Sequence, residues 1–255
     1  MVVQQELWAK SPERPILTTG EVHVWRADMN QDRATINTYL KLLSPDEKER
    51  AGKYYFQRDR EYFVVARGVL RMILSRYIDL SPEQIAFSFN PYGKPALRQG
   101  VGDDLLRFNV AHSGTVALYA FTRGREIGID IEYIQQNCWS LELAEHFFSP
   151  TEVSMLSALA PQSRTLAFFD CWTRKEAYIK ARGEGLSHPL NRFTVSVTPG
   201  QPASLLTTDG EPREASRWTL MDLFPGREYR AALAVEGTPC GVRLLAVAAG
   251  SLISG

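Results

Sequence analysis

The pattern of hydrophobic and polar residues along the chain predicts strands mixed with long helices. Residues 21–25 alternate in apolar character like a strand, and residues 44–77 then follow the period of an amphipathic helix. A further strand is predicted over 85–89, and two more over 105–121 on either side of a turn at His112–Gly114. This mixture is typical of an α+β fold.

The second half of the chain repeats this order. Residues 126–134 predict a strand, and a helix begins at Ser149-Pro150 with Glu152 in the capping position. After a loop at 160–163, residues 170–186 show helical spacing and end at two glycines. Three later strands are predicted over 192–197, 218–223 and 229–235.

Two short echoes favour an internal duplication. The tetrapeptide 44–47 (SPDE) resembles 149–152 (SPTE), and the tripeptide ARG occurs at both 66–68 and 181–183. Similarity this slight is also expected by chance, so both interpretations stay open. A true duplication predicts two α+β halves related by a pseudo-twofold axis, with a ligand cleft between them. The polar junction TRGRE divides the chain into residues 1–124 and 125–255.

Composition and charge exclude several classes of function. The chain has 255 residues, and its 29 Lys plus Arg balance 29 Asp plus Glu, which argues against a nucleic-acid or membrane-surface partner. The N-terminus has no signal-peptide core and the longest apolar stretch is too short to span a bilayer, so a cytoplasmic protein is expected. Widely spaced cysteines predict reduced thiols, and without an HExxH motif no transition-metal site is expected.

Two acidic residues in the segment GIDIE are candidates for chemistry. Asp130 and Glu132 project from one face of the predicted strand, while Ile129 and Ile131 fill the other. Adjacent carboxylates repel, so they need a cation, either a basic side chain or a hard metal such as Mg²⁺. The alternative is a strand end whose acids face water.

The segment WTRKEAYIK supplies further charged residues on a predicted helix. Trp172, Glu176 and Lys180 are four residues apart and share one face, with Lys175 on its flank. A glutamate–lysine salt bridge on a solvated surface is one interpretation. In the other, the helix packs near the GIDIE strand, so that Glu176 adds a third carboxylate and both lysines bind phosphate.

The first half contributes local positive charge. The turn fixed by Gly93 and Pro95 presents the Lys94 ammonium and backbone N–H groups, which suits an anion. His112 lies at the end of a strand, where a structural role is the alternative to ligand binding. Three arginines share one face of the helical segment, and a solvated mixed-charge surface is the default interpretation for them: Arg60, Arg67 and Arg71.

Taken in order, the segments YGKP, NVAHSG, GIDIE and WTRKEAYIK resemble the Sfp-type 4′-phosphopantetheinyl transferases. The family pattern GxDxE followed by WxxKExxxK is met at every defining position. The resemblance implies a pseudo-dimer of two α+β halves with the active site in the cleft between them. It also implies a monomeric, Mg²⁺-dependent enzyme that transfers 4′-phosphopantetheine from coenzyme A to a serine of an apo acyl or peptidyl carrier protein, releasing 3′,5′-ADP.

The resemblance also implies roles for individual residues. Asp130, Glu132 and Glu176 would hold Mg²⁺ against the pyrophosphate, with Lys180 close by. Glu152 matches a glutamate proposed in the family as the base that takes the serine proton, and a metal-bound hydroxide is the alternative base. Six residues would line the coenzyme A site, with the first and last near the 3′-phosphate: Arg50, Gly93, Lys94, Pro95, Asn109 and His112.

Some features depart from the family or leave the function open. Ala111 replaces the first serine of the usual Ser-His-Ser, and Glu47 stands where some members carry lysine. A non-catalytic module that binds coenzyme A or a carrier protein is the alternative function. Another phosphoryl transferase is disfavoured, because the chain has no GxxxxGK[ST] loop. Four apolar residues are predicted either to receive a carrier helix or to pack in the core: Phe147, Phe148, Met155 and Leu156.

Overall fold

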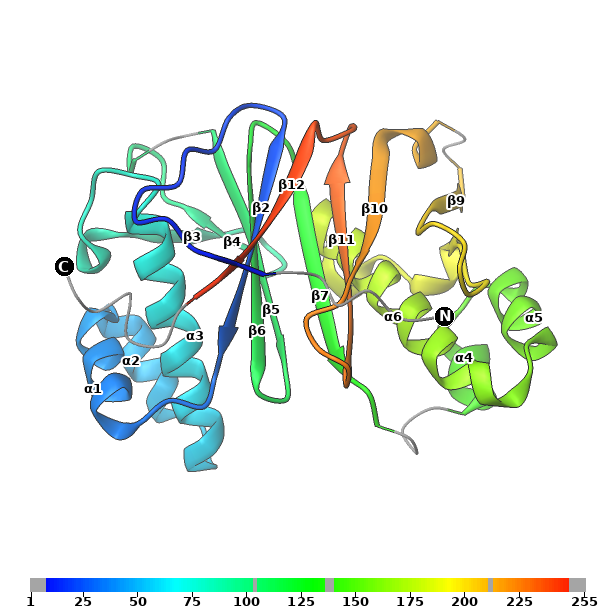
Figure 1. The fold of residues 1–255 in the computed structure, drawn as a ribbon, viewed down its shortest axis with the longest axis horizontal. Helices are drawn as coiled ribbons and strands as arrows, with labels where there is room; N and C mark the ends of the chain where they lie inside the picture. The colour runs from blue at the N-terminus through cyan, green and yellow to red at the C-terminus, as the bar shows by residue number, and fades with distance from the viewer. Residues whose placement is uncertain (1–7, 103–104, 136–139, 211–212, 248–255) are drawn as a thin grey trace.

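The protein folds into four layers, with helices outside and two sheets inside (Figure 1). The computed structural model describes residues 8–102, 105–135, 140–210 and 213–247. The first layer contains α1 (Arg33–Leu42), α2 (Pro45–Gly52) and α3 (Gln57–Ser75), and the last contains α4 (Leu141–Phe147), α5 (Pro150–Ala158) and α6 (Pro161–Arg182). The α+β fold built from two halves is thus confirmed.

The sheet of the first half has five strands in the order β1-β12-β2-β6-β5. Their bounds are Ala9–Lys10, Gly241–Ala246, Glu21–Asp28, Val116–Arg123 and Leu106–Ser113 in that order. Strand β12 comes from the end of the chain and pairs in parallel with β2. The predicted division into residues 1–124 and 125–255 stays a prediction. Strand β12 lies in the second of these segments but pairs within the sheet of the first half.

The sheet of the second half has three antiparallel strands, β10 (Trp218–Leu223), β11 (Tyr229–Glu236) and β7 (Ile127–Tyr133). Isoleucines 127, 129 and 131 of β7 pack between the two sheets, so the alternate residues face α6. Two hairpins complete the strands: β3 (Phe87–Phe89) with β4 (Pro95–Leu97), and β8 (Phe193–Val195) with β9 (Leu205–Thr208). Single 3₁₀ turns occur at Pro82–Gln84, Gly185–Ser187, Leu190–Arg192 and Ala215–Arg217.

Helix α6 lies directly on β7 at a glycine. A Cβ atom on Gly128 would be 2.1 Å from the carbonyl oxygen of Ala177 and 2.3 Å from the amide nitrogen of Ala181. No side chain fits in that space, so the glycine of GIDIE allows helix and strand to touch. This contact places the charged residues of β7 next to those of α6.

The two sequence echoes have different outcomes. Ser44 and Ser149 begin α2 and α5 with the same capping box, followed by proline in the first turn. The ARG echo has no structural counterpart, because Gly68 packs against Tyr39 inside α3, whereas Gly183 ends α6 with a positive φ of 74°. The first echo therefore corresponds to a capping box that occurs in both halves, and the second corresponds to no shared structure.

Several element boundaries differ from the predicted ones. The stretch 44–77 forms two helices, α2 and α3, and the loop predicted at 160–163 is wrong because α6 begins at Pro161. Helices α1 and α4 and strands β1, β4, β9 and β12 were not predicted, and none exceeds ten residues. Cys171 and Cys240 are free thiols, and Cys138 lies outside the described residues. Within the described ranges, no helix is long and apolar enough to cross a membrane.

Candidate active site

The charged residues of β7 and α6 meet where β5 lies beside β7. The Lys180 Nζ is 2.5 Å from Asp130 Oδ1. The Ser113 hydroxyl of β5 donates to Glu132 Oε2 at 3.1 Å and accepts from the Tyr133 backbone N–H at 2.9 Å. Three elements therefore converge on one cluster, and the interpretation in which α6 packs near the GIDIE strand is correct.

Electrostatic coupling shows that Glu176 belongs to this cluster. Burial and the nearby Asp130 carboxylate raise the pKa of Glu176 to about 7, with Lys180 opposing and Glu132 adding to the rise. Burial also raises the pKa of Asp130, and burial together with Asp130 raises that of Glu132. Burial works against the charge of Lys180, but the three carboxylates outweigh it and raise its pKa. One ammonium thus faces three carboxylates.

The cluster has the donor chemistry of a hard-cation site. Asp130 Oδ2 is buried, and among the residues that the structure describes it has no hydrogen-bond partner. Carboxylate oxygens are the ligands that Mg²⁺ prefers, so the residues fit this ion. The described residues contain no group of three His, Cys, Asp or Glu side chains already arranged around a metal position. Mg²⁺ therefore stays a prediction.

Lys175 and Glu152 lie elsewhere. Both are 0% exposed, and the Lys175 Nζ is 2.8 Å from Glu152 Oε2. The prediction that Lys175 binds phosphate beside the metal is wrong, because its ammonium is sealed in the core of the second half. The position of Glu152 does not support its predicted role as the base, since no substrate hydroxyl can reach the carboxylate in this arrangement.

Two of the predicted coenzyme A residues make internal contacts. The Lys94 Nζ donates to Glu126 Oε2, Ile127 O and Ala181 O at 3.0, 3.2 and 2.9 Å, which uses all its N–H groups. Asn109 is buried, and its Oδ1 accepts from the Ile129 backbone N–H at 2.9 Å. Both side chains join the two halves in this structure.

The remaining predicted coenzyme A residues are more accessible. His112 is exposed on β5, and partial enclosure and the nearby Lys180 ammonium lower its pKa. Arg50 is exposed on α2, with its guanidinium 5.5 Å from the centre of the Phe63 ring. Gly93 is exposed at the tip of the β3–β4 hairpin with a φ of 85°, and Pro95 begins β4. Coenzyme A binding by these residues stays a prediction.

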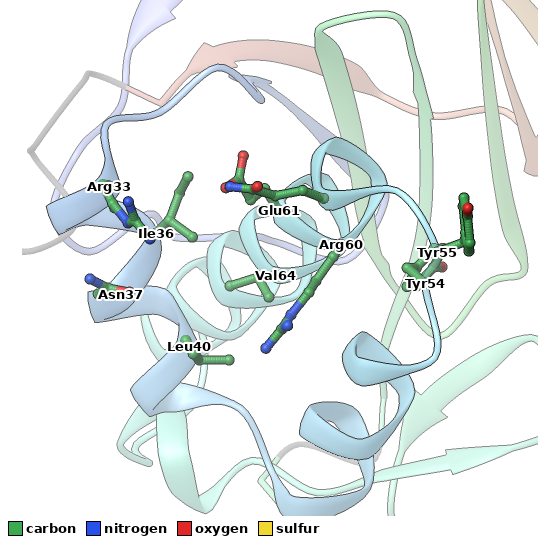
Figure 2. A pocket seen from close by; sticks show the side chains of 10 residues that line it. Arg33, Ile36, Asn37, Leu40, Tyr54, Tyr55, Arg60, Glu61 and Val64 are labelled. Carbon is green, nitrogen blue, oxygen red and sulfur yellow. The ribbon is translucent and has the colours of Figure 1, made fainter.

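A pocket of about 380 Å³ lies between the halves. Lys94 and Pro95 line it together with Arg107 of β5 and Arg182 at the end of α6, but the carboxylate cluster does not. A second pocket, of about 440 Å³, lies between α1 and α3 in the first half (Figure 2). Arg60 lines this second pocket, whereas Arg67 and Arg71 pair with the buried Glu47. The predicted basic face is thus divided between two surroundings.

Some contributions were not predicted. Ser113 lies in the segment NVAHSG, but its bond to Glu132 depends on a distant strand and left no signal in the sequence. Arg230 of β11 is paired with Glu132 in the register of the two strands, and its Nε is 3.1 Å from Oδ1 of Asp170 on α6. The core interpretation holds for Phe148 and Leu156, which are 2% and 0% exposed.

Comparison with known proteins identifies the family. Residues 25–123 match the family model described as 4′-phosphopantetheinyl transferase, N-terminal, and residues 126–234 match the 4′-phosphopantetheinyl transferase superfamily model. The 4′-phosphopantetheinyl transferase HetI of Nostoc sp. is 37% identical over 233 residues, covering 91% of this chain and 95% of HetI. The chain belongs to the 4′-phosphopantetheinyl transferase superfamily.

Sfp of Bacillus subtilis, another 4′-phosphopantetheinyl transferase, is 36% identical over 159 residues, covering 62% of this chain and 67% of Sfp. The resemblance noted in the sequence is therefore confirmed, and so is the enzyme class. The chain is therefore an enzyme that transfers 4′-phosphopantetheine. No observation on the described residues favours the non-catalytic alternative.

Proposed function

We propose that coenzyme A is the donor and a serine of an apo acyl or peptidyl carrier protein is the acceptor, with 3′,5′-ADP as the other product. One observation carries the proposal: Asp130, Glu132 and Glu176 gather around the Lys180 ammonium, whose one positive charge is fewer than their three carboxylates and leaves room for a cation. A metal ion together with a basic side chain is what a pyrophosphate requires. The enzyme would act as a cytoplasmic monomer with no nucleic-acid partner.

Asp130, Glu132 and Glu176 would hold Mg²⁺, with Asp130 Oδ2 as the oxygen that now has no partner among the described residues. When bound, the ion would supply charge neutralisation for the pyrophosphate of coenzyme A. The residues of the chain do the rest. Lys180 would turn from Asp130 to a pyrophosphate oxygen and neutralise it, and Arg50 and His112 would bind the 3′-phosphate.

The reaction forms a bond between the serine oxygen and the β-phosphorus and breaks the bond from that phosphorus to the oxygen of the 3′,5′-ADP leaving group. The serine proton must pass to a base within hydrogen-bond reach. Negative charge grows on the phosphoryl and leaving oxygens, where Lys180 stabilises it. Positioning and electrostatics thus account for the catalysis that this cluster can provide.

The direct test mixes the protein with coenzyme A, Mg²⁺ and a panel of apo carriers from fatty-acid, polyketide and peptide synthases. Mass spectrometry should show one phosphopantetheine added to the carrier serine, and a serine-to-alanine carrier is the control. Omitting Mg²⁺ in the presence of a chelator should stop the reaction. If no carrier in the panel gains mass, the non-catalytic binding module becomes the better interpretation.

A further inference from the structure

Glu47 and Glu152 occupy the same place in the two halves. Each is the third residue of a helix that begins with proline after a capping serine, and each accepts from the backbone N–H of that serine, at 3.0 Å for Ser44 and 2.8 Å for Ser149. Glutamate side chains are almost never fully buried unless they are paired, but these two are only 4% and 0% exposed. A buried carboxylate requires a partner cation.

Both carboxylates find that cation on the long helix of their own half. Glu47 contacts the guanidinium groups of Arg67 and Arg71 on α3 at 2.6 and 2.7 Å, and Glu152 contacts Lys175 on α6 at 2.8 Å. Glu47 belongs to the half that lacks the carboxylate cluster, so its ion pairs serve the fold. The repeated geometry indicates that Glu152 has the same kind of role.

The bonds of the Glu152–Lys175 pair connect three elements. Glu152 Oε1 accepts from the Val195 backbone N–H of β8 at 2.6 Å. The Lys175 Nζ also donates to the carbonyl oxygens of Leu190 and Phe193 at 2.8 and 2.6 Å. These contacts tie α5, α6 and β8 together and occupy both carboxylate oxygens and all three N–H groups of the ammonium.

Lys175 directly precedes Glu176 in the sequence and lies five residues before Lys180. Because successive residues of a helix point about 100° apart, holding Lys175 in the core fixes the rotation of α6 about its axis. We propose that Glu152 is a positioning residue and not the base: with Lys175 it sets the rotation that aims Glu176 and Lys180 at Asp130. This inference rests on the proposed function of those three residues.

The test is a double-mutant cycle with Glu152→Gln, Lys175→Met and both together. The melting temperature, the transfer rate and Mg²⁺ binding by calorimetry are measured for each. Lys175→Met should lower the melting temperature by about 10 °C, because it leaves a buried charge unpaired, and should weaken Mg²⁺ binding about tenfold. The double variant should regain more than half of the lost melting temperature, since neither charge remains, but its Mg²⁺ binding should stay weak, since the pair that fixes the rotation of α6 is gone.

Glu47→Gln is the matched control. It removes the equivalent carboxylate of the other half, so it should lower the melting temperature without changing Mg²⁺ binding. If Lys175→Met does not fold, Glu152→Gln is compared with this control alone. A lower melting temperature together with weaker Mg²⁺ binding in Glu152→Gln supports the positioning role.

A catalytic base predicts the opposite pattern. Glu152→Gln would then lower kcat on the order of 10²- to 10⁴-fold while Mg²⁺ binding stays unchanged. That result would overturn the inference. If the proposed function is wrong, the wild-type protein will modify no carrier. The melting temperatures of the variants would still measure how strongly the Glu152–Lys175 pair stabilises the fold.

Discussion

Two lysines of α6, five residues apart, each pair with a carboxylate, but their surroundings differ. The Lys175 side chain is 0% exposed, and its ammonium and the Glu152 carboxylate are completely hydrogen-bonded. The Lys180 side chain is 30% exposed, and its partner Asp130 keeps one buried oxygen without a partner among the described residues. A completely hydrogen-bonded ion pair has no free donor or acceptor for a ligand, whereas an incompletely bonded pair can bind one.

The balance of charge separates the two pairs further. Glu152 and Lys175 neutralise each other, but Lys180 faces Asp130 together with Glu132 and Glu176. Burial, and after it the excess of negative charge, raises the pKa of Glu176 to about 7, so its charged form is costly at this place. A protein tolerates such a cost mostly at sites that do chemistry. The comparison therefore separates residues that hold α6 in place from residues that we propose act on substrate.

The largest expected effect comes from Glu176→Gln, which keeps the shape of the side chain and removes its charge. Transfer should fall about 10³-fold, because a ligand of the ion is lost. The melting temperature should rise slightly, since repulsion from Asp130 is relieved. Carrier modification followed by mass spectrometry and a thermal scan measure the two effects. Unchanged turnover would count decisively against the metal assignment.

Lys180→Met should lower transfer about 10²-fold, because the pyrophosphate loses a charged partner. The same change should strengthen Mg²⁺ binding, since the ammonium that competes for Asp130 is gone. A lower transfer rate together with a higher metal affinity is expected only for the Lys180–Asp130 pair. Calorimetry with Mg²⁺ alone is the measurement, and weaker binding in the variant would contradict the assignment.

Gly128→Ala tests whether both pairs depend on the contact between α6 and β7. The added Cβ would lie 2.1 Å from the Ala177 carbonyl oxygen, so the helix must shift, at a cost of about 2–3 kcal/mol in the free energy of unfolding. Urea unfolding measures this loss. Gly52→Ala is the control, because nothing lies within 4 Å of its Cβ position. Equal stability of the two variants would show that the contact is loose.

The smallest effect is a pH dependence of Mg²⁺ binding. Because the pKa of Glu176 is raised to about 7, a proton competes with the ion below that pH. Affinity should rise about tenfold per pH unit below pH 6, about fivefold between pH 6 and 7, and level off above about pH 8. Calorimetry at a series of pH values measures this slope, and Glu176→Gln should remove the contribution.

The same shift also predicts how the stability of the metal-free protein changes with pH. Glu176 binds its proton more tightly in the folded protein than its ordinary pKa of 4.5 implies. The folded state therefore holds more protons between about pH 4.5 and 7, and stability should fall as pH rises through that range. Denaturant unfolding at several pH values tests the sign, with Glu176→Gln again as the control.

Local sequence patterns were sufficient for much of the fold. The strands β5, β6, β7, β10 and β11 and the start of α5 were predicted because alternation and capping are properties of adjacent residues. The short helices α1 and α4 and strand β12 were not, since their stability comes from contacts with distant parts of the chain. Proline in the first turn of α6 was taken for a loop.

The chemistry of the site was predicted in part for the same reason. The alternation in GIDIE placed Asp130 and Glu132 on one face, and the spacing in WTRKEAYIK placed Glu176 and Lys180 together. The same spacing placed Lys175 on the flank of that face, but it did not predict that Lys175 is buried in the core. Lys94 and Asn109 were predicted only to line the coenzyme A site, and their hydrogen bonds between the two halves were not predicted.

The sequence by itself determined which residues share a face, where helices begin, and which charged groups are available to one another within a segment, because these follow from backbone geometry over a few residues. Tertiary structure alone decided which of those charges are sealed in the core and which remain incompletely paired. That choice depends on the rotation and depth of α6 against β7 and β8, which distant contacts set.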